Sequence, residues 1–376
     1  MFLSRLLHLN DIENIVLERR PIEYVLGRIR AGVLEQGTVD LMHEVGLGQR
    51  ISDEGLVHGG IGIGSNGQLQ QIDVNRLTGG RNVTVYGQTE ITHDLYNVAN
   101  HAAYPVIDNV SDIEISHHDS GQPTVSFTQG GKTFSVSGEF IAGCDGFHGV
   151  CRQSIPDSHR QEYHLAYPFG WLGILSETPP VSNEVAYISH QRGFALCSMR
   201  NQNLSRYYIQ VPENARVEDW SDQQFWQEFK LRLPDELADV LVTGDSIEKS
   251  IAPLRAFVCS ELNYGNLFLA GDSGHIVPPT GAKGLNLAVS DVRYLSDALI
   301  QYFANGDRTA LNNYSRTALA RVWKVVRFSL WCTRLLHAFP EQTAFDDKIQ
   351  QADLDYLLSS ESAQMSFAEN YAGLPY

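Results

Sequence analysis

The segment GDSGHIVPPTGAKGLN, residues 271–286, follows the short apolar run NLFLA and leads into a stretch with helical character. Its glycines let backbone amides approach a ligand closely, whereas the adjacent Pro278 and Pro279 stiffen the loop and fix the direction of its carbonyls. The segment therefore predicts a strand, a rigid loop and a helix. A loop of this kind suits a flat or anionic ligand.

The size and charge of the chain limit its class. With 376 residues it is too long for one ordinary core and suits two closely joined domains or one large α/β body. Its formal net charge is −16 and no run of Lys or Arg occurs, which argues against nucleic-acid binding because phosphates require a basic face. We expect an acidic, soluble protein.

Cysteines and the first residues indicate where the protein works. Its five cysteines form no CxxC pair, so neither a zinc site nor a disulfide framework is expected, and a reducing cytoplasm fits. The apolar start is interrupted by Arg5 and Asp11, which makes it too short and too charged for a signal peptide or a membrane helix. We therefore expect a cytoplasmic protein without a membrane anchor.

The first 18 residues resemble the second half of a β-α-β unit. Leucines at helical spacing occupy residues 1–9, and the apolar run NIVLE ends at Glu18, where nucleotide-binding folds place the acid that binds a ribose hydroxyl. The glycine-rich turn that should precede the helix is absent. We therefore expect a misplaced start or a truncated chain that lacks the first strand and the pyrophosphate-binding amides.

An apolar strand that ends in a Gly/Asp turn occurs twice, at IAGCDG with Asp145 and at FLAGD with Asp272. Either could be a simple turn, but together with Glu18 these acids could surround one nucleotide. Arg28 and Arg30 stand two residues apart in GRIRAG and could both face a pyrophosphate, or could be solvated surface charges.

The remaining pattern predicts the other elements. GGIGIGSNGQLQQID and TVSFTQGGKTFSVSG alternate like hairpins, the stretch GVLEQGTVDLMHEVGL is helical in character, and helices are expected at 223–233 and from about residue 286 onward. Strands between residues 164 and 211 carry polar groups that could converge on one ligand with a carboxylate and a phenol, although tyrosines in strands usually pack. These groups are Tyr187, Ser198, Arg200, Arg206, Tyr207 and Tyr208. His58 and His148 are isolated, so no metal site is expected.

Strings spread from about residue 12 to Tyr376 resemble the para-hydroxybenzoate hydroxylases, a branch of the class A FAD-dependent aromatic hydroxylases. They are RIRAGVLEQG, VYGQTE, IAGCDGFHG, YPFGWLG, RGFALCS, SIAPLR, GDSGHIVPPTGAKGLN and ENYAGLPY. The resemblance implies an α/β fold: an incomplete Rossmann-like FAD-binding domain over 1–160, a mixed β-sheet substrate domain over 161–265, and a flavin-contacting loop with a helical C-terminal region over 266–376.

For the cofactor, the resemblance implies that Glu18 binds the FAD ribose and that residues 279–286 lie against the flavin. Further cofactor contacts are implied for Arg28, Arg30, Gln88, Asp145, Arg206, Asp272, Lys283, Gly284, Leu285 and Asn286. Nicotinamide binding is implied for Arg19, Tyr24, His148 and Arg255, and favours NADPH, although Arg20, Pro21 and Ile22 depart from the family pattern and leave NADH open.

For the substrate, the resemblance implies that Ser198, Arg200 and Tyr208 hold the carboxylate of 4-hydroxybenzoate. Tyr187 would bond the phenol and Tyr371 would bond Tyr187, while Pro279 adds a carbonyl and His58 ends a proton relay. The reaction implied is hydroxylation to 3,4-dihydroxybenzoate (protocatechuate) with NADPH and O2, in the degradation of aromatic compounds. A cytoplasmic homodimer is implied as well.

Two departures qualify the resemblance. Ser273 and Gly274 replace a commoner Ala-Ala pair and should be tolerated, whereas the missing glycine-rich turn leads us to expect weak FAD binding or poor folding of this chain. Two alternatives stay open: a related flavin hydroxylase of another aromatic acid, and a truncated, cofactor-free protein that binds an aromatic acid. Flavin content would separate the two classes.

Overall fold

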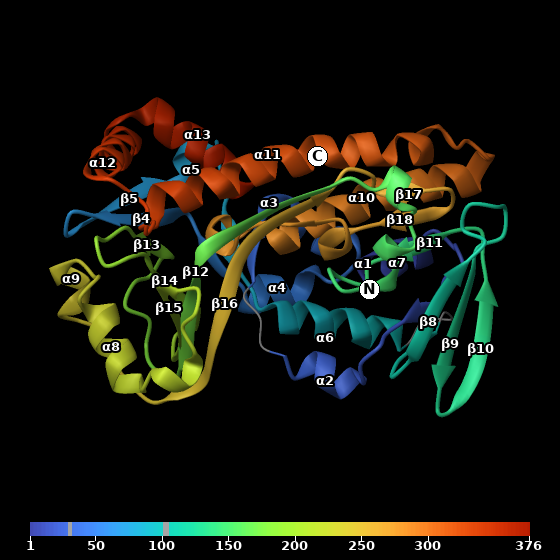
Figure 1. Ribbon diagram of the computed structural model, residues 1–376, viewed down its shortest axis with the longest axis horizontal. Coiled ribbons are helices and arrows are strands. Elements are labelled where there is room, and N and C mark those ends of the chain that lie inside the picture. The colour runs from blue at the N-terminus through green and yellow to red at the C-terminus, as the bar shows by residue number, and fades with distance from the viewer. Residues whose placement is uncertain (29–31, 101–104) are drawn as a thin grey trace.

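The computed structural model describes residues 1–28, 32–100 and 105–376. Its largest sheet has eight strands in the order β19-β16-β12-β15-β14-β13-β4-β5, and β12 and β16 run the length of the molecule (Figure 1). Every pairing is antiparallel except that of β13 with β4. The strands are β4 (Gly60–Ser65), β5 (Gln68–Asp73), β12 (Glu162–Ser176), β13 (Ala186–Ile188), β14 (Ala195–Asn201), β15 (Leu204–Pro212), β16 (Ser246–Cys259) and β19 (His275–Ile276).

Four small sheets make up the rest of the strand structure. They are β1 (Val16–Leu17) with β7 (Val106–Ile107), β11 (Ile141–Gly143) with β18 (Leu267–Leu269) and β17 (Asn263–Tyr264), β2 (Val33–Glu35) with β6 (Val83–Val85) and β3 (Leu56–His58), and β8 (Ser111–Ser116) with β9 (Thr124–Gln129) and β10 (Lys132–Ser137). The β1–β7 and β11–β18 pairs are parallel, as in a nucleotide-binding α/β domain.

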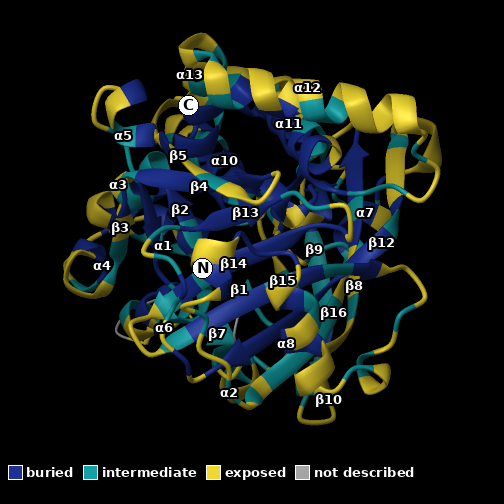
Figure 2. Cartoon of the chain, turned by 90° about the vertical axis from the view of Figure 1, so that its left-hand side faces the viewer, coloured by how far each residue is buried: buried dark blue, intermediate teal, exposed yellow. Residues whose placement is uncertain are grey.

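Two long helices, α10 (Gly284–Asn305) and α11 (Thr309–Leu336), lie side by side across the molecule (Figure 1). The other helices are α1 (Phe2–His8), α2 (Ile22–Leu26), α3 (Gln36–Glu44), α4 (Gly48–Glu54), α5 (Val74–Leu77), α6 (Gln88–Ala99), α7 (Val150–Gln153), α8 (Asp222–Lys230), α9 (Asp235–Ala238), α12 (Ala344–Ser359) and α13 (Glu361–Ala372). In Figure 2 the strands are mostly buried and the outer face of α12 is exposed.

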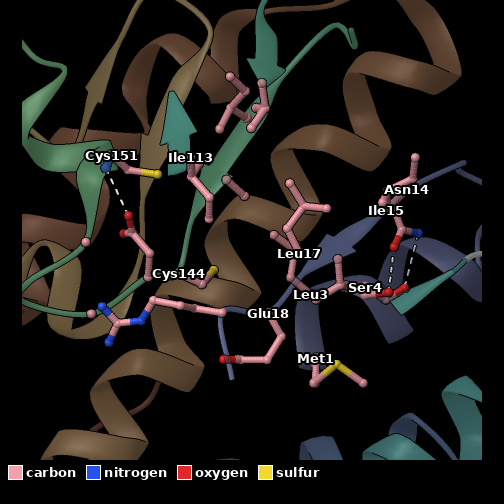
Figure 3. Close-up of a pocket in the computed structure, with 18 of the residues that line it drawn as sticks. Met1, Leu3, Ser4, Asn14, Ile15, Leu17, Glu18, Ile113, Cys144 and Cys151 are labelled. Carbon is pink, nitrogen blue, oxygen red and sulfur yellow. Dashed lines mark hydrogen bonds between the residues drawn. The ribbon is translucent and has the colours of Figure 1, made fainter. Parts of the chain in front are cut away.

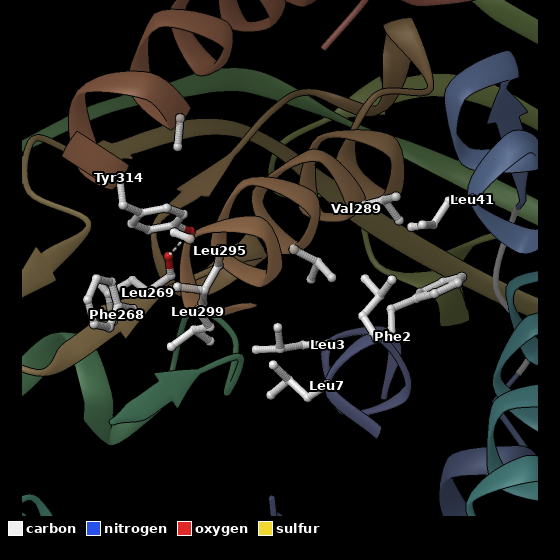
Figure 4. Packing of buried hydrophobic residues seen from close by; sticks show 14 of the residues in the cluster. Phe2, Leu3, Leu7, Leu41, Phe268, Leu269, Val289, Leu295, Leu299 and Tyr314 are labelled. Atoms are coloured by element: carbon white, nitrogen blue, oxygen red, sulfur yellow. Dashed lines mark hydrogen bonds between the residues drawn. The ribbon is translucent and has the colours of Figure 1, made fainter. Parts of the chain in front are cut away.

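The core beside α10 explains why the first residues fold as a helix. Phe2, Leu3 and Leu7 are buried on one face of α1 and belong to one apolar cluster with Val289 and Leu295 of α10 (Figure 4). A seven-residue helix is marginal alone, so its stability comes from this packing. No helix in the described ranges is long and apolar enough to cross a bilayer.

Both predicted hairpins form. β4 and β5 are joined at Asn66 and Gly67, and β9 and β10 at Gly130 and Gly131, all four with positive φ as a type I′ turn requires. The helical expectation for residues 32–47 is wrong at its start, because Val33–Glu35 pairs with β6 and α3 begins only at Gln36. Non-local pairing overrides the local helical pattern there.

The sheet does not follow the boundaries expected from the sequence. Strands β4 and β5 come from residues 60–73 and β19 from residues 275–276, so all three expected ranges contribute to the one sheet. The chain therefore enters and leaves the eight-stranded sheet several times. The three ranges themselves remain a prediction.

Candidate active site

A cavity of about 2360 Å³ opens between β1 and β11 (Figure 3). The three acids singled out in the sequence, Glu18, Asp145 and Asp272, all line it, together with Gln88 at the start of α6. The four residues come from separate parts of the chain. Each acid follows the end of a strand, and Gln88 begins a helix. The cavity therefore brings together the acids expected to surround one nucleotide.

One wall of the cavity is apolar. Leu3, Leu17, Ile113 and Ile141 contribute to it, and Cys144 projects beside Glu18 (Figure 3). Within the described ranges β1 pairs only with β7, and β11 only with β18, so each keeps an edge that no described strand covers. An apolar wall with polar groups at one side is typical of a cofactor site.

Short local contacts hold two of the acids in place. Glu18 Oε1 accepts a hydrogen bond from the Arg20 amide at 2.8 Å, which bends the chain after β1. Asp145 Oδ2 accepts one from the Cys151 amide at 2.9 Å, at the start of the short helix α7. Both carboxylates keep further lone pairs for a ligand.

The residues expected to bind the nicotinamide cofactor line the same cavity, and Arg28 does so as well. They are Arg19, Tyr24, His148 and Arg255. The guanidinium carbon of Arg28 lies 6.0 Å from the ring centre of Tyr24, and that of Arg255 lies 4.1 Å from the ring centre of Phe147. Arg30 is outside the described residues. The cavity thus carries arginines suited to phosphate groups.

Other expected cofactor residues do not line this cavity. They are Arg206, Lys283, Gly284, Leu285 and Asn286. The Lys283 ammonium pairs with Glu35 at 2.8 Å and donates to the Tyr371 carbonyl at 2.8 Å. Asn286 Oδ1 accepts from the Glu35 amide at 2.9 Å, so both side chains hold the loop rather than face the cavity.

Arg206 takes part in the eight-stranded sheet. It is buried, pairs with Glu248 at 3.0 Å and donates to Ser250 Oγ at 3.0 Å. Its guanidinium carbon lies 5.1 Å from the ring centre of Tyr208. Because Arg206 pairs with Ser198 and precedes Tyr208 by two residues, it lies on the same face of the sheet as these two residues of the expected carboxylate-binding group.

That group shares one face of β14 and β15. Leu196 pairs with Tyr208 and Ser198 with Arg206, so Ser198 and Tyr208 project on the same side of the sheet. Arg200 lies where the register shifts between Met199 and Asn201, close enough to Tyr208 for the phenol to affect its pKa. Arg200 Nε is buried and has no hydrogen-bond partner among the described residues. Burial also lowers the pKa of the Arg200 guanidinium. The residue as a whole is half-buried, and Glu248 offsets part of the pKa decrease. A cation whose Nε is buried without a partner favours an anionic ligand.

Two tyrosines of the expected substrate site, Tyr187 and Tyr371, lie close together. The rings of Tyr187 on β13 and Tyr371 on α13 are 6.4 Å apart and perpendicular, and both side chains are buried. Burial and then the neighbouring Tyr371 raise the pKa of Tyr187 well above its usual value. The Tyr371 hydroxyl is buried and has no hydrogen-bond partner of normal geometry within the described ranges. Burial raises the pKa of this phenol, an effect that the nearby Tyr187 offsets only in part.

His58 lies near this pair, and the sequence reasoning missed its neighbour. His58 is 2% exposed, and its Nδ1 is 3.2 Å from Glu184 Oε2, whose side chain is 28% exposed. Glu184 stands three residues before Tyr187 and raises the pKa of Tyr371. Its position just before a strand that carries an expected site residue was the only signal in the sequence.

Pro279 begins a single turn of 3₁₀ helix, Pro279–Gly281, just ahead of α10. Its ring is exposed, whereas the following Thr280 is buried and bonds Thr333 Oγ1 at 2.9 Å. Ala282 adopts a left-handed conformation with φ 54°, which reverses the chain into the helix. The predicted loop is therefore rigid and is anchored to α11.

Comparison with known proteins places this geometry in a family. Residues 1–329 match the family model described as FAD binding domain, so the chain belongs to that family and the predicted α/β fold is confirmed. The chain is 51% identical over 376 residues to the p-hydroxybenzoate hydroxylase of Acinetobacter baylyi, covering 100% of this chain and 93% of that protein. The protein is an FAD-dependent aromatic hydroxylase.

Solved structures agree on the fold. The p-nitrophenol 4-monooxygenase PnpA of Pseudomonas putida DLL-E4 superimposes with a TM-score of 0.82 over 100% of this chain and 96% of its own, at 15% identity. PqsL of Pseudomonas aeruginosa, a probable FAD-dependent monooxygenase, gives 0.75 over 98% and 96%, at 17% identity. At these identities the likeness concerns the fold alone.

Proposed function

We propose that the protein hydroxylates 4-hydroxybenzoate to 3,4-dihydroxybenzoate, using FAD, NADPH and O2. The observation that carries the proposal is the arrangement of the sheet face. Arg200 on β14 is half-buried, with a buried Nε that has no partner among the described residues, and Tyr187 on β13 meets Tyr371 on α13. The similarity to the Acinetobacter baylyi p-hydroxybenzoate hydroxylase supports the same substrate.

Arg200 would hold the substrate carboxylate. The guanidinium fork can donate two parallel hydrogen bonds to a carboxylate, and the buried surroundings strengthen that contact. Ser198 and Tyr208 lie on the same face. Tyr208 would offer a hydroxyl donor to the carboxylate, whereas the Ser198 hydroxyl donates to the Arg206 carbonyl at 2.9 Å and would have to turn to bind the substrate. Substrate binding would therefore relieve the cost of burying this cation without a partner.

Tyr187 would accept the proton of the substrate phenol while passing its own to Tyr371. An ionised phenol makes its ortho carbon nucleophilic, so proton removal is the chemistry that the chain must supply. Because burial keeps both tyrosines neutral at physiological pH, each can donate one hydrogen bond and accept another. His58 and the partly exposed Glu184 would carry the proton towards solvent.

The cavity fits FAD in size and in donor set. Glu18 and Asp272 suit ribose and ribityl hydroxyls, and the arginines at its rim suit the pyrophosphate. When bound, FAD supplies the redox and oxygen chemistry of the reaction. The chain would contribute orientation of the cofactor through the residues that line the cavity, and a half-buried sheet face for the substrate that limits the access of water.

Three further parts of the proposal concern the reductant, the location and the assembly of the protein. NADPH is favoured over NADH because Arg19 and Tyr24 both line the cavity. A cytoplasmic location agrees with the free thiols of all five cysteines. A homodimer and a role in the degradation of aromatic compounds come from the family resemblance.

A substrate panel tests the proposal. The chain, supplied with excess FAD and NADPH, is assayed with 4-hydroxybenzoate, 3-hydroxybenzoate, benzoate and 4-hydroxyphenylacetamide, and products are identified by mass. We expect hydroxylation of 4-hydroxybenzoate at the highest kcat/KM, because it alone combines a ring carboxylate with a para phenol. Preference for another acid would favour a related hydroxylase, and a chain that binds 4-hydroxybenzoate but no flavin would favour a cofactor-free binding protein.

A further inference from the structure

A buried ion pair lies beneath the cofactor side of the molecule. His275 Nε2 on β19 is 2.5 Å from Asp291 Oδ2 on α10, and the two side chains are 2% and 0% exposed. The same Asp291 oxygen accepts a hydrogen bond from the Gly271 amide at 2.8 Å. One carboxylate oxygen thus binds two donors, one on each side of the turn that contains Asp272.

The contacts of Asp291 with Gly271 and His275 lie in and just after the glycine- and proline-rich segment 271–286. Gly271–Ser273 forms a single 3₁₀ turn after β18, with Gly271 at φ 68°. Asp272 in this turn faces the cavity, whereas α10 begins at Gly284, at the end of the rigid loop. Asp291 lies two helical turns inside α10, so it fixes the turn relative to the helix that carries the loop.

Burying the two charges of the His275–Asp291 pair costs desolvation free energy. Asp291 Oδ1 is buried and has no partner in the part of the chain that the structure describes. Replacing a buried ion pair by apolar side chains is often neutral or stabilising, so such a pair is weak evidence for a role in stability. A buried acceptor left unsatisfied adds to the cost. The specific gain is geometric, because the Gly271 amide in the turn and the His275 ring on β19 share one Asp291 oxygen.

We propose that Asp291 and His275 are positioning residues for the cofactor, which set the Gly271–Ser273 turn against α10 so that Asp272 faces the FAD cavity. The proposal rests on the FAD-binding part of the proposed function and not on the identity of the aromatic substrate. Neither side chain lines the cavity, so both act through the backbone of the turn.

The first test measures the dissociation constant of FAD by fluorescence titration of the apoprotein. Asp291→Ala removes the shared acceptor, and we expect affinity to fall about tenfold or more, the usual effect of losing a charge-assisted hydrogen bond. Asp291→Asn keeps an amide oxygen that can accept both bonds, so it should restore affinity to within about threefold of the wild type. Asp297→Ala, at a side chain 55% exposed on the same helix, is the control and should bind as the wild type does.

The second test needs no FAD. Amide hydrogen exchange over residues 270–276 of the apoprotein should be faster in Asp291→Ala than in the wild type and the Asp297→Ala control. If Asp291→Ala does not fold, His275→Ala, which leaves the Gly271 bond in place, should show the same two effects at smaller size. Unchanged FAD affinity and unchanged exchange in the folded variants would overturn the inference. A wild-type chain that bound no FAD would contradict the proposed function, while exchange would still decide whether the pair orders the turn.

Discussion

At the scale of single residues, Tyr187 is the group on which the proposed chemistry depends. Replacing it with Phe removes the proton acceptor but keeps the ring that packs against Phe194. We expect hydroxylation of 4-hydroxybenzoate to fall by about 100-fold, the usual contribution of a general base, while its dissociation constant changes by less than about fivefold. Tyr163→Phe, at a side chain 44% exposed, is the control for losing a phenol. Full hydroxylation by Tyr187→Phe would rule out the relay.

Replacing Arg200 should weaken substrate binding without lowering the stability of the free protein. Its burial lowers the pKa of the guanidinium, which means that the folded protein disfavours the charged form. Arg200→Met should therefore keep or raise the melting temperature of the free protein, while weakening 4-hydroxybenzoate binding by about 100-fold through the lost charge-assisted bonds. Thermal unfolding with and without substrate measures both effects. A variant that lost stability but bound substrate normally would show that Arg200 has only a structural role.

At the scale of elements, the contact between β19 and α10 predicts a pH dependence. Burial lowers the pKa of His275, but the charge of Asp291, its hydrogen bond and the charge of Asp272 together raise it above 6.5. The folded state therefore holds the proton more tightly than the unfolded chain does. This stabilisation is complete below pH 6.5 and is lost as pH rises through the raised pKa.

The difference in melting temperature between the wild type and His275→Gln, measured from pH 5 to pH 9, isolates this contribution. We expect the wild-type advantage to shrink as pH rises. A difference that stayed constant or grew with pH would contradict a raised pKa for His275 in the folded protein.

The C-terminal segment is held by a second buried cluster. Arg321 on α11 pairs with Glu35 at 3.2 Å and donates to the carbonyls of Leu374 and Pro375 at 2.7 and 3.0 Å. Arg321→Gln should lower the free energy of unfolding by about 3 kcal/mol, because it breaks a buried pair. Arg327→Gln on the same helix, where the side chain is exposed, should cost no more than about 0.5 kcal/mol. Urea unfolding of both variants checks this, and equal losses would contradict the account.

Local sequence patterns predicted individual turns and strand ends well, but they did not predict the pairings and contacts between distant residues. The turn residues of both hairpins and the strand ends at Glu18, Asp145 and Asp272 carry local signals, and the structure gathers those three acids around one cavity. The parallel pairing of β4 with β13 joins residues more than a hundred positions apart, so no local signal reports it. The contacts of Glu184 with His58 and of Asp291 with His275 were missed for the same reason.

At the scale of the whole molecule, the proposed function requires a negatively charged chain to bind an anionic substrate and an anionic cofactor. The net charge of −16 opposes both ligands at long range, so binding depends on the few cations placed inside the two sites. Arg28, Arg255 and other basic groups line the cavity, and Arg200 lies in the expected substrate site on the sheet. Function therefore depends on the fold that brings these two sites together.

Product analysis of the FAD-loaded chain tests that claim most directly. The protein is incubated with excess FAD, NADPH, O2 and 4-hydroxybenzoate, and the reaction is followed by chromatography against authentic 3,4-dihydroxybenzoate. We predict that this product forms and that it disappears when FAD, NADPH or O2 is omitted. A chain whose visible spectrum shows bound flavin and which consumes NADPH without releasing any hydroxylated product would contradict the proposed function.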